Sequence, residues 1–593
     1  MRSPALPLLL LALGTPLLAA TYHVARQAEN AADENPGTQA KPWQSIARAG
    51  SAKELKPGDT VLVHAGVYRE HVEIKVSGKP GRPITFAAAP GARVVIKGSE
   101  RIQGKWTKLT DDTTAAEPYP NAFANVWGIQ LGDEFFTDPR FEGAYRDKMR
   151  RWVSQVFVQD NLPLQRIGAS PIYTNEPYLK LRTIGRGLAD IVQDSFYFDA
   201  KDQTLYIKTA GAPSWYSIEV GVRGFVVTAN DVRDVVIRGF EMRHNRQPGG
   251  QWPMVCITQC ERVTIEDCTV RFADFCGLGV GRSRSCVVRR CDLSWNGNTG
   301  LGMSQCEDCV VEDSTLLFNN TRRFHPGWHA GGMKCIPGNK RCTVRRCEAA
   351  YNINSDGIWF DADNADIRIL GNLSHHNDGC GIFFEINKGG GLIADNLVYA
   401  NRGRGIYISG SQKTWVVHNT VAANGAGIVA MPRGPDWPLH DVHVLNNLLI
   451  GNYIGAQNHH ARGCDLTLFM GTPKEHDYTR TVTTNHSDYN VYATTSWTPT
   501  LRHSWNPDNT LGQWRQRFGE DLHSRQMPVA FEQRGTGFRL LTTDGLDIAC
   551  PLPERLGWRS PLAARARRRA FLGLFPRRAP RPCRVGSSIT NWP

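Results

Sequence analysis

Two short phrases of similar sequence end on carboxylates that could act together in catalysis. Gly357-Ile-Trp-Phe-Asp ends on Asp361, and 24 residues later Gly381-Ile-Phe-Phe-Glu ends on Glu385. If the phrases are strands of neighbouring coils, both acids face outward in one column, with backbones about 4.8 Å apart. Carboxylates this close repel each other, so one of them readily retains a proton. A separation of roughly 5 Å is the geometry of retaining glycosidases, which use one nucleophile and one acid/base.

Aromatic residues accompany the two acids. Lys334, Trp359, Phe383 and Tyr407 fall in the adjacent outward column, which would be an unusually apolar strip on a bare surface. A sugar ring stacked on the strip, or another part of the chain covering it, would explain this composition. Aromatic faces beside a carboxyl also tend to raise its pKa by desolvation, as a general acid requires. The alternative is a pair of solvated surface acids without a catalytic role.

A repeat accounts for the spacing of the two phrases. A glycine followed by a short apolar strand recurs at intervals of 23, 32, 25, 24, 24 and 22 residues, at Gly277, Gly300, Gly332, Gly357, Gly381, Gly405 and Gly427. Each repeat has room for two or three short strands and a turn but not for a crossover helix. The fold class predicted is all-β, a right-handed single-stranded parallel β-helix with an inserted antiparallel β domain.

The longest interval contains an insertion that leads into the coil before Asp361. Trp328, His329 and Lys334 lie in or directly after it and are predicted to form a wall of the substrate site. Ordinary packing of a loop is the alternative for these three residues.

A second recurring column predicts a ladder inside the coils. Cys268, Cys291, Ser314, Cys347, Asn372, Asn396, Asn419 and Asn447 occupy equivalent positions. Asparagines in such a column can hydrogen-bond along the stack, and cysteines fill the same place as small buried residues. Twelve of the fifteen cysteines lie between Cys256 and Cys380. Neighbouring coils are also close enough for some of these thiols to form disulfides.

The change of pattern along the chain predicts six segments. They are a signal peptide (1–20), an N-terminal cap with the first coils (21–98), the inserted antiparallel domain (99–223), the main β-helix with the site (224–493), a capping region (494–554) and a basic disordered tail (555–593). The signal peptide predicts a secreted or periplasmic protein without a membrane span.

The net charge of +13 does not indicate nucleic-acid binding. Ten arginines and no Asp, Glu or Lys lie between residues 555 and 593, so most of the excess positive charge belongs to the tail. The rest of the chain is close to neutral. We therefore predict an oligo- or polysaccharide partner and no nucleic acid, and the sequence leaves the oligomeric state open.

Gly-Ile-Trp-Phe-Asp, followed 24 residues on by an acid after Phe-Phe and then by Ile-Asn, resembles the β-helical β-xylosidase family of glycoside hydrolases. In that family a β-sandwich interrupts the β-helix. The resemblance implies that Asp361 is the nucleophile, Glu385 the acid/base and Asn387 a substrate-binding residue, with no cofactor or metal. This chain departs from the family pattern in the Ala-Asp-Asn after Asp361 and in Lys388, where the family has His.

Two other functions fit the same residues. In a polysaccharide lyase, Asp361, Asp363 and Asp366 would hold Ca²⁺ together with Glu385, and Lys334 or Arg404 would act as the base. A chelator would abolish lyase activity and spare a hydrolase. A non-catalytic glycan-binding or structural β-helix protein would need only the aromatic strip.

Overall fold

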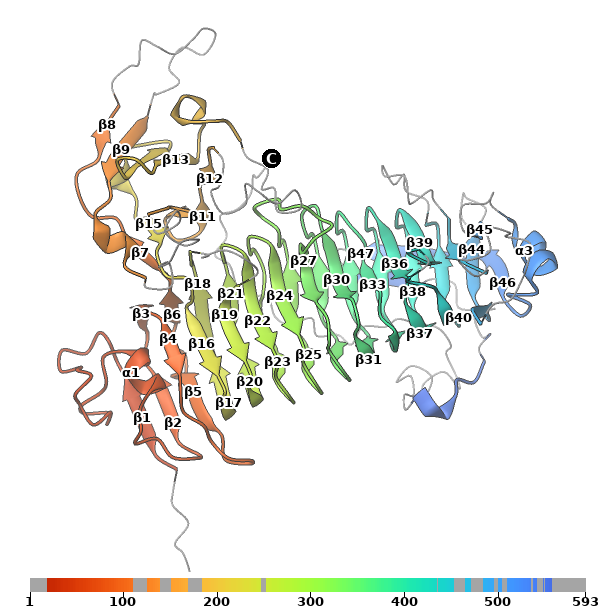
Figure 1. Cartoon of the computed structure of the whole chain (residues 1–593), viewed down its shortest axis with the longest axis horizontal. Helices are drawn as coiled ribbons and strands as arrows, with labels where there is room; N and C mark the ends of the chain where they lie inside the picture. Colours follow the sequence, from red (N-terminus) through yellow and green to blue (C-terminus); the bar gives the residue numbers. More distant parts are fainter. Residues whose placement is uncertain are drawn as a thin grey trace, which may run out of the picture.

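The computed structural model shows a long stack of coils, with a second group of strands beside its N-terminal part (Figure 1). It describes residues 19–109, 125–138, 151–168, 184–246, 252–434, 436–452, 464–470, 484–494, 500–503, 509–534, 537–540, 548 and 550–556. Apart from residues 19–20 and 555–556, the predicted signal peptide and basic tail lie outside these ranges. None of the helices described has the length and apolar character needed to cross a bilayer.

Three parallel faces run along the stack, formed by a 13-stranded sheet, a 12-stranded sheet and a third face of four-stranded and eight-stranded sheets. The 12-stranded sheet contains the two predicted acids. Its strands are, in order, β4 (Val72–Ile74), β16 (Val227–Asn230), β19 (Pro253–Thr258), β22 (Cys276–Gly281), β24 (Thr299–Ser304), β27 (Gly331–Cys335), β30 (Asp356–Asp361), β33 (Ile382–Glu385), β36 (Arg404–Ser409), β39 (Ala426–Met431), β42 (Leu466–Leu468) and β45 (Leu501–Arg502). The predicted parallel β-helix is confirmed.

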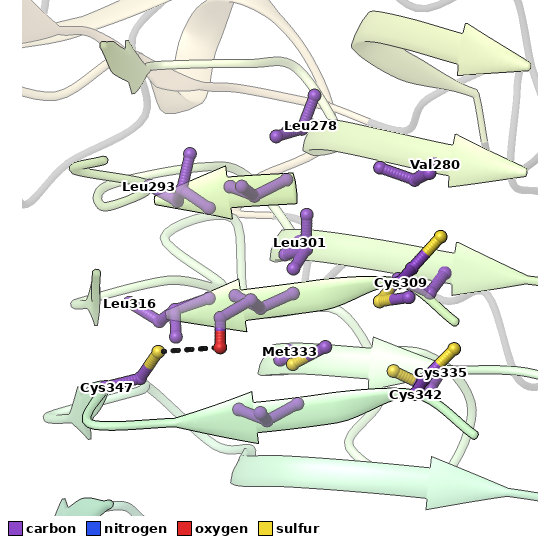
Figure 2. Close-up of a cluster of buried hydrophobic side chains, with 14 of the residues drawn as sticks. Leu278, Val280, Leu293, Leu301, Cys309, Leu316, Met333, Cys335, Cys342 and Cys347 are labelled. Atoms are coloured by element: carbon purple, nitrogen blue, oxygen red, sulfur yellow. Dashed lines mark hydrogen bonds between the residues drawn. The ribbon is translucent and has the colours of Figure 1, made fainter. Parts of the chain in front are cut away.

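Inward side chains of successive coils stack into one continuous core. Leu278, Leu301, Met333, Ile358 and Ile382 are register partners along the 12-stranded sheet, and each is completely buried. Figure 2 shows the first three of them lying one above another inside the coils. Because side chains alternate across a strand, this column fixes which residues of each strand face outward.

The predicted asparagine ladder is present. The backbone N–H of Asn372 donates to Oδ1 of Asn396 at 2.9 Å, and that of Asn396 donates to Oδ1 of Asn419 at 3.0 Å. Cys347 enters the same ladder, because its N–H donates to Oδ1 of Asn372 at 3.0 Å. These side chains are all buried. The ladder therefore satisfies backbone groups that the turns leave without a partner.

The cysteines of the described residues are all free thiols, and most of them are buried. Burial raises the pKa of Cys268 and that of Cys347 to about 12, so both are held as thiols. They behave as small apolar residues that fill the inner side of the turns. Figure 2 shows the Cys347 sulfur reaching a backbone carbonyl oxygen, that of Val311, at 3.7 Å.

Antiparallel strands interrupt the coils after residue 98. One sheet contains β7 (Ser99–Arg101), β15 (Ile218–Gly221), β10 (Val156–Val158) and β11 (Leu162–Pro163); the other contains β8 (Thr107–Lys108), β9 (Val126–Gln130), β14 (Thr204–Lys208), β13 (Ser195–Asp199) and β12 (Gln165–Arg166). All pairings among them are antiparallel except that of β12 with β13. Parallel pairing with the earlier coils resumes at β16.

The stack extends beyond the predicted end at residue 493. Strand β45 pairs with β42, and β46 (Arg525–Pro528) pairs with β44 (Val491–Thr494). Helix α3 (Leu511–Phe518) lies at this end, where Thr510 and Gln513 form a capping box. Trp514 of this helix is completely buried in the common core. The other α-helix described, α1 (Ile46–Gly50), packs beside β4 at the opposite end.

Candidate active site

The two predicted acids are register partners on neighbouring coils. Asp361 is the last residue of β30 and Glu385 the last residue of β33, and their Cα atoms pair directly in the parallel ladder. Adjacent parallel strands lie about 4.8 Å apart, so both side chains project side by side from the same face of the sheet. The Asp361 side chain is 24% exposed and that of Glu385 is 5% exposed.

Outward aromatic rings form a stack next to the acids. Lys334, Trp359, Phe383 and Tyr407 are successive register partners. The ring centroids of Trp359 and Phe383 lie 5.0 Å apart, and those of Phe383 and Tyr407 lie 4.8 Å apart, with nearly parallel planes. The predicted column therefore exists. Stacked rings of this kind are rigid, so they fix the positions of the polar atoms at their edges.

Lys334 binds Asp361. Its Nζ lies 2.9 Å from Oδ2 of Asp361, donates to the backbone oxygen of Trp328 at 2.6 Å, and stands 3.1 Å from the ring centroid of Trp359. The side chain is almost fully buried. Burial, partly opposed by the charge of Asp361, lowers the pKa of Lys334 to about 8. The lysine therefore supplies a positive charge to Asp361 at neutral pH and loses it in mildly alkaline solution.

Glu385 has two partners of different kinds. The indole Nε1 of Trp359 donates to its Oε2 at 3.0 Å, and the guanidinium of Arg433 forms an ion pair with its Oε1. Arg433 lies in the loop after β39, 48 residues from Glu385 in the sequence. Sequence reasoning did not find it, because its loop lies outside the repeating phrase.

A third acid, Asp356 at the start of β30, was also missed by the sequence analysis. It is buried, and its Oδ1 accepts a hydrogen bond from the backbone N–H of Cys380. Burial raises the pKa of Asp356 to about 6, although the positive charges of Lys334 and Arg404 act in the opposite direction. Asp356 thus interacts electrostatically with Lys334, the partner of Asp361.

The insertion before β27 contributes in an unexpected way. His329 is buried, with its Nδ1 2.9 Å from Oδ1 of Asn298 and 3.0 Å from Oγ1 of Thr299. Burial lowers the pKa of His329 to about 3, so it is neutral and held inside the structure. Trp328 acts on the site through its backbone oxygen, which binds Lys334. Its ring packs beside that of Phe275, with centroids 5.8 Å apart.

Asn387 does not lie with the other predicted site residues. Its side chain is completely buried, accepts from the backbone N–H of Asn364 at 3.0 Å and donates to the backbone oxygen of Phe360 at 3.0 Å. The prediction that it binds substrate is wrong for a physical reason. Ile386 has a φ of 54°, which breaks the strand alternation after Glu385 and turns the next side chain inward.

The acids invoked for a calcium site do not converge. Within the described ranges, three potential ligands come together at Asp160, Glu219 and His244. The ammonium of Lys97 lies 3.0 Å from Glu219 and also pairs with Asp160, so a cation already neutralises that cluster. Asp363 and Asp366 are exposed on the turn after β30 and on the neighbouring strand.

Comparisons with known proteins concern the fold. Residues 254–421 match the family model described as a right handed beta helix region. A solved structure described as the complex of XylC with xylose has a TM-score of 0.63 to this chain at 19% identity, with 88% of this chain and 89% of that chain covered. Another, described as a glycoside hydrolase, has a TM-score of 0.47 at 12% identity, with 86% and 97% covered.

One match to a protein sequence covers only a short stretch. A stretch of 69 residues is 39% identical to the uncharacterized protein YwoF of Bacillus subtilis (strain 168), which is 12% of this chain and 14% of that protein. The match thus spans a small part of the relative. The family model and the structural likeness agree with the pairing of the sheets: the coils that carry Asp361 and Glu385 are those of a right-handed parallel β-helix.

Proposed function

We propose that the protein is an exported carbohydrate-active enzyme, a retaining glycoside hydrolase with Asp361 as nucleophile and Glu385 as acid/base. The observation that carries the proposal is the direct register of these two acids on adjacent coils. Strands in direct register lie about 4.8 Å apart, which is compatible with the separation of roughly 5 Å that a double displacement requires. The likeness to a xylose-bound structure supports a sugar as the ligand.

In the first step, a carboxylate oxygen of Asp361 attacks the anomeric carbon of the sugar. The bond from that carbon to the leaving oxygen breaks, and Glu385 gives its proton to the leaving group. Lys334, whose Nζ lies 2.9 Å from Oδ2 of Asp361, holds this carboxyl group in position for the attack. The products of this step are a free alcohol and a glycosyl ester on Asp361.

In the second step, water attacks the anomeric carbon of the ester. Glu385, now a carboxylate, takes a proton from the water, and the carbon–oxygen bond to Asp361 breaks. Trp359 orients Glu385 through its indole N–H in both steps. Its face and those of Phe383 and Tyr407 provide the apolar surface on which a sugar ring can stack.

A screen against aryl glycosides tests the function. We expect the purified protein to release nitrophenol from at least one such substrate, with or without a chelator. Asp361→Asn should lower kcat by about 10⁴-fold or more, and Glu385→Gln by about 10²–10⁴-fold. Azide should partly restore Glu385→Gln and give a glycosyl azide of retained configuration.

Asp366→Asn is a matched control, because Asp366 is an exposed acid five residues from Asp361 on the neighbouring strand. It should leave activity unchanged. An ultraviolet-absorbing unsaturated product that disappears with chelator would replace this proposal with the lyase alternative. Failure to cleave any glycoside, together with glycan binding that survives Asp361→Asn, would favour a binding protein.

A further inference from the structure

A half-exposed arginine covers the acid/base. The side chain of Glu385 is 5% exposed, whereas that of Arg433, its ion-pair partner, is 50% exposed. The guanidinium therefore contacts Glu385 while half of the Arg433 side chain surface is open to solvent. A leaving group cannot reach Glu385 along this direction until Arg433 moves.

The loop that carries Arg433 is held close to the site. The N–H of Arg433 donates to the backbone oxygen of Trp437 at 3.0 Å, and the N–H of Trp437 donates to that of Gly434 at 3.2 Å. The loop packs on Gly410, where a Cβ atom would come within 2.8 Å of Trp437 and 3.2 Å of Arg433. Gly410 directly follows Ser409, the register partner of Glu385. The backbone of Arg433 is thus fixed beside Glu385, and its long side chain is the part that can move.

The ion pair conflicts with the proposed chemistry in the free protein. A carboxylate paired with a guanidinium is ionised, whereas a general acid must carry a proton when the substrate binds. Two other positive charges near the site have partners of their own. Lys334 binds Asp361, and the guanidinium carbon of Arg404 lies 4.1 Å from the ring centroid of Tyr407. Of these three cations, Arg433 is the most exposed to solvent.

We propose that Arg433 binds a carboxylate on the sugar itself, so that the substrate class is a glycoside of a uronic acid. The carboxylate takes the guanidinium from Glu385, and Glu385 is then uncovered and able to hold a proton. Guanidinium groups bind planar carboxylates through two parallel hydrogen bonds, which a neutral sugar hydroxyl cannot match. Trp437, 38% exposed on the same loop, offers a further ring face next to this position. This inference rests on the proposed hydrolase.

The test compares matched aryl glycosides with and without the carboxylate. We expect kcat/KM for 4-nitrophenyl β-D-glucuronide or β-D-galacturonide to exceed that for the corresponding glucoside or galactoside by at least about 10-fold. Arg433→Ala should remove most of this preference by lowering the rate on uronides, and Arg433→Lys should restore part of it. Arg402→Ala is the control, because Arg402 is an exposed arginine paired with Asp378 at 3.1 Å, away from the two catalytic acids.

Equal or faster cleavage of neutral glycosides by the wild type would overturn the inference while leaving the hydrolase in place. So would an equal loss on both series in Arg433→Ala, or a preference for 6-sulfated galactosides over galacturonides. Binding separates the inference from the reaction. Free D-galacturonate and D-glucuronate should bind more tightly than galactose and glucose by calorimetry, and Arg433→Ala should abolish the difference. If this holds but no glycoside is cleaved, the proposed hydrolase fails and the carboxylate site stands.

Discussion

Two buried clusters of acids and bases lie on this β-helix, and they differ in how completely their carboxylates are satisfied. Where the antiparallel strands meet the first coils, Glu219 contacts Arg69 at 2.6 Å, Lys97 at 3.0 Å and Ser99 at 2.7 Å. Burial opposes ionisation there, but hydrogen bonds from His244 and Arg69 and the charge of Lys97 hold the pKa of Glu219 well below its ordinary value.

In the second cluster, the acids Asp361 and Glu385 lie close to solvent. Asp361 is a quarter exposed beside its partner Lys334, and Glu385 is covered by an arginine that is half exposed. The stacked rings of Trp359, Phe383 and Tyr407 lie in the column next to this pair. Burial alone therefore does not separate a structural acid from one proposed to be catalytic. The difference lies in the partners, because saturated carboxylates hold two parts of the chain together and accessible ones can react.

The largest expected effect is a loss of stability from a change in the first cluster and a loss of activity from a change in the second. Glu219→Gln should lower the free energy of unfolding by about 3–5 kcal/mol, because Lys97 and Arg69 would lose their buried partner. Its activity per folded molecule should stay the same. Asp361→Asn should abolish activity with a smaller loss of stability, because Lys334 keeps the backbone oxygen of Trp328 as a partner and, with a pKa of about 8, can release its proton. Thermal unfolding and initial rates on the same samples check both, and a loss of stability in Asp361→Asn as large as that in Glu219→Gln would refute the distinction.

The next effect is a pH dependence of the accessible cluster. Because burial lowers the pKa of Lys334 to about 8, kcat/KM should fall as pH rises through about 8 and Asp361 loses its cationic partner. Stability should change in the opposite direction. Unfolded lysine keeps its proton to about pH 10.4, so the unfolded state binds more protons between these values and this residue's contribution to stability rises with pH.

Two substitutions of Lys334 distinguish the effect of its positive charge from the effect of its losing a proton near pH 8. Lys334→Arg keeps the charge at high pH and should remove the alkaline fall near pH 8, while Lys334→Met should be slow at every pH. Lys413→Met, at an exposed lysine of the 13-stranded sheet, should match the wild type. If the fall of kcat/KM at alkaline pH persists unchanged in Lys334→Arg, a group other than Lys334 causes it.

A smaller effect, on stability, is expected from Asn387, which is buried in the interior. Asn387→Ala should lower the free energy of unfolding by about 1–3 kcal/mol, since the N–H of Asn364 and the backbone oxygen of Phe360 would be left unpaired in the interior. The Michaelis constant should not change. Asn230→Ala, at an exposed asparagine at the end of β16, is the control. A rise in KM without a loss of stability would restore Asn387 as a substrate-binding residue.

The smallest effect concerns the thiols. Cys268 and Cys347 are buried with pKa values raised to about 12, so they should not react with a thiol reagent until the protein unfolds. Mass spectrometry after brief alkylation checks this. Rapid labelling of either residue in the folded protein would contradict the buried ladder.

Periodicity explains what could be predicted from the sequence. The spacing of the glycine phrases indicates the coils, and the spacing of 24 residues brings Asp361 into register with Glu385. Strand alternation correctly places Trp359, Phe383 and Tyr407 in the neighbouring outward column. These features depend on local geometry that every coil repeats, so the same pattern can be recognised several times in one chain.

Residues in irregular segments escaped the sequence analysis. Arg433 reaches Glu385 from a loop whose path depends on Gly410 and on the carbonyl of Trp437, and no repeat encodes that path. Asn387 was misplaced because a single left-handed residue, Ile386, ends the alternation that holds up to Glu385. The positions of residues that depart from the repeat cannot be predicted from the repeat.

The most direct measurement is the identity of the residue that becomes covalently attached to the sugar. The protein would be incubated with 2-deoxy-2-fluoroglycosyl fluorides of the uronic-acid and neutral series, digested, and analysed by mass spectrometry. We predict one adduct, on the peptide that contains Asp361, and its loss in Asp361→Asn. An adduct on Glu385 or on any other residue, or no adduct from a protein that cleaves the parent aryl glycoside, would contradict the assignment of the pair.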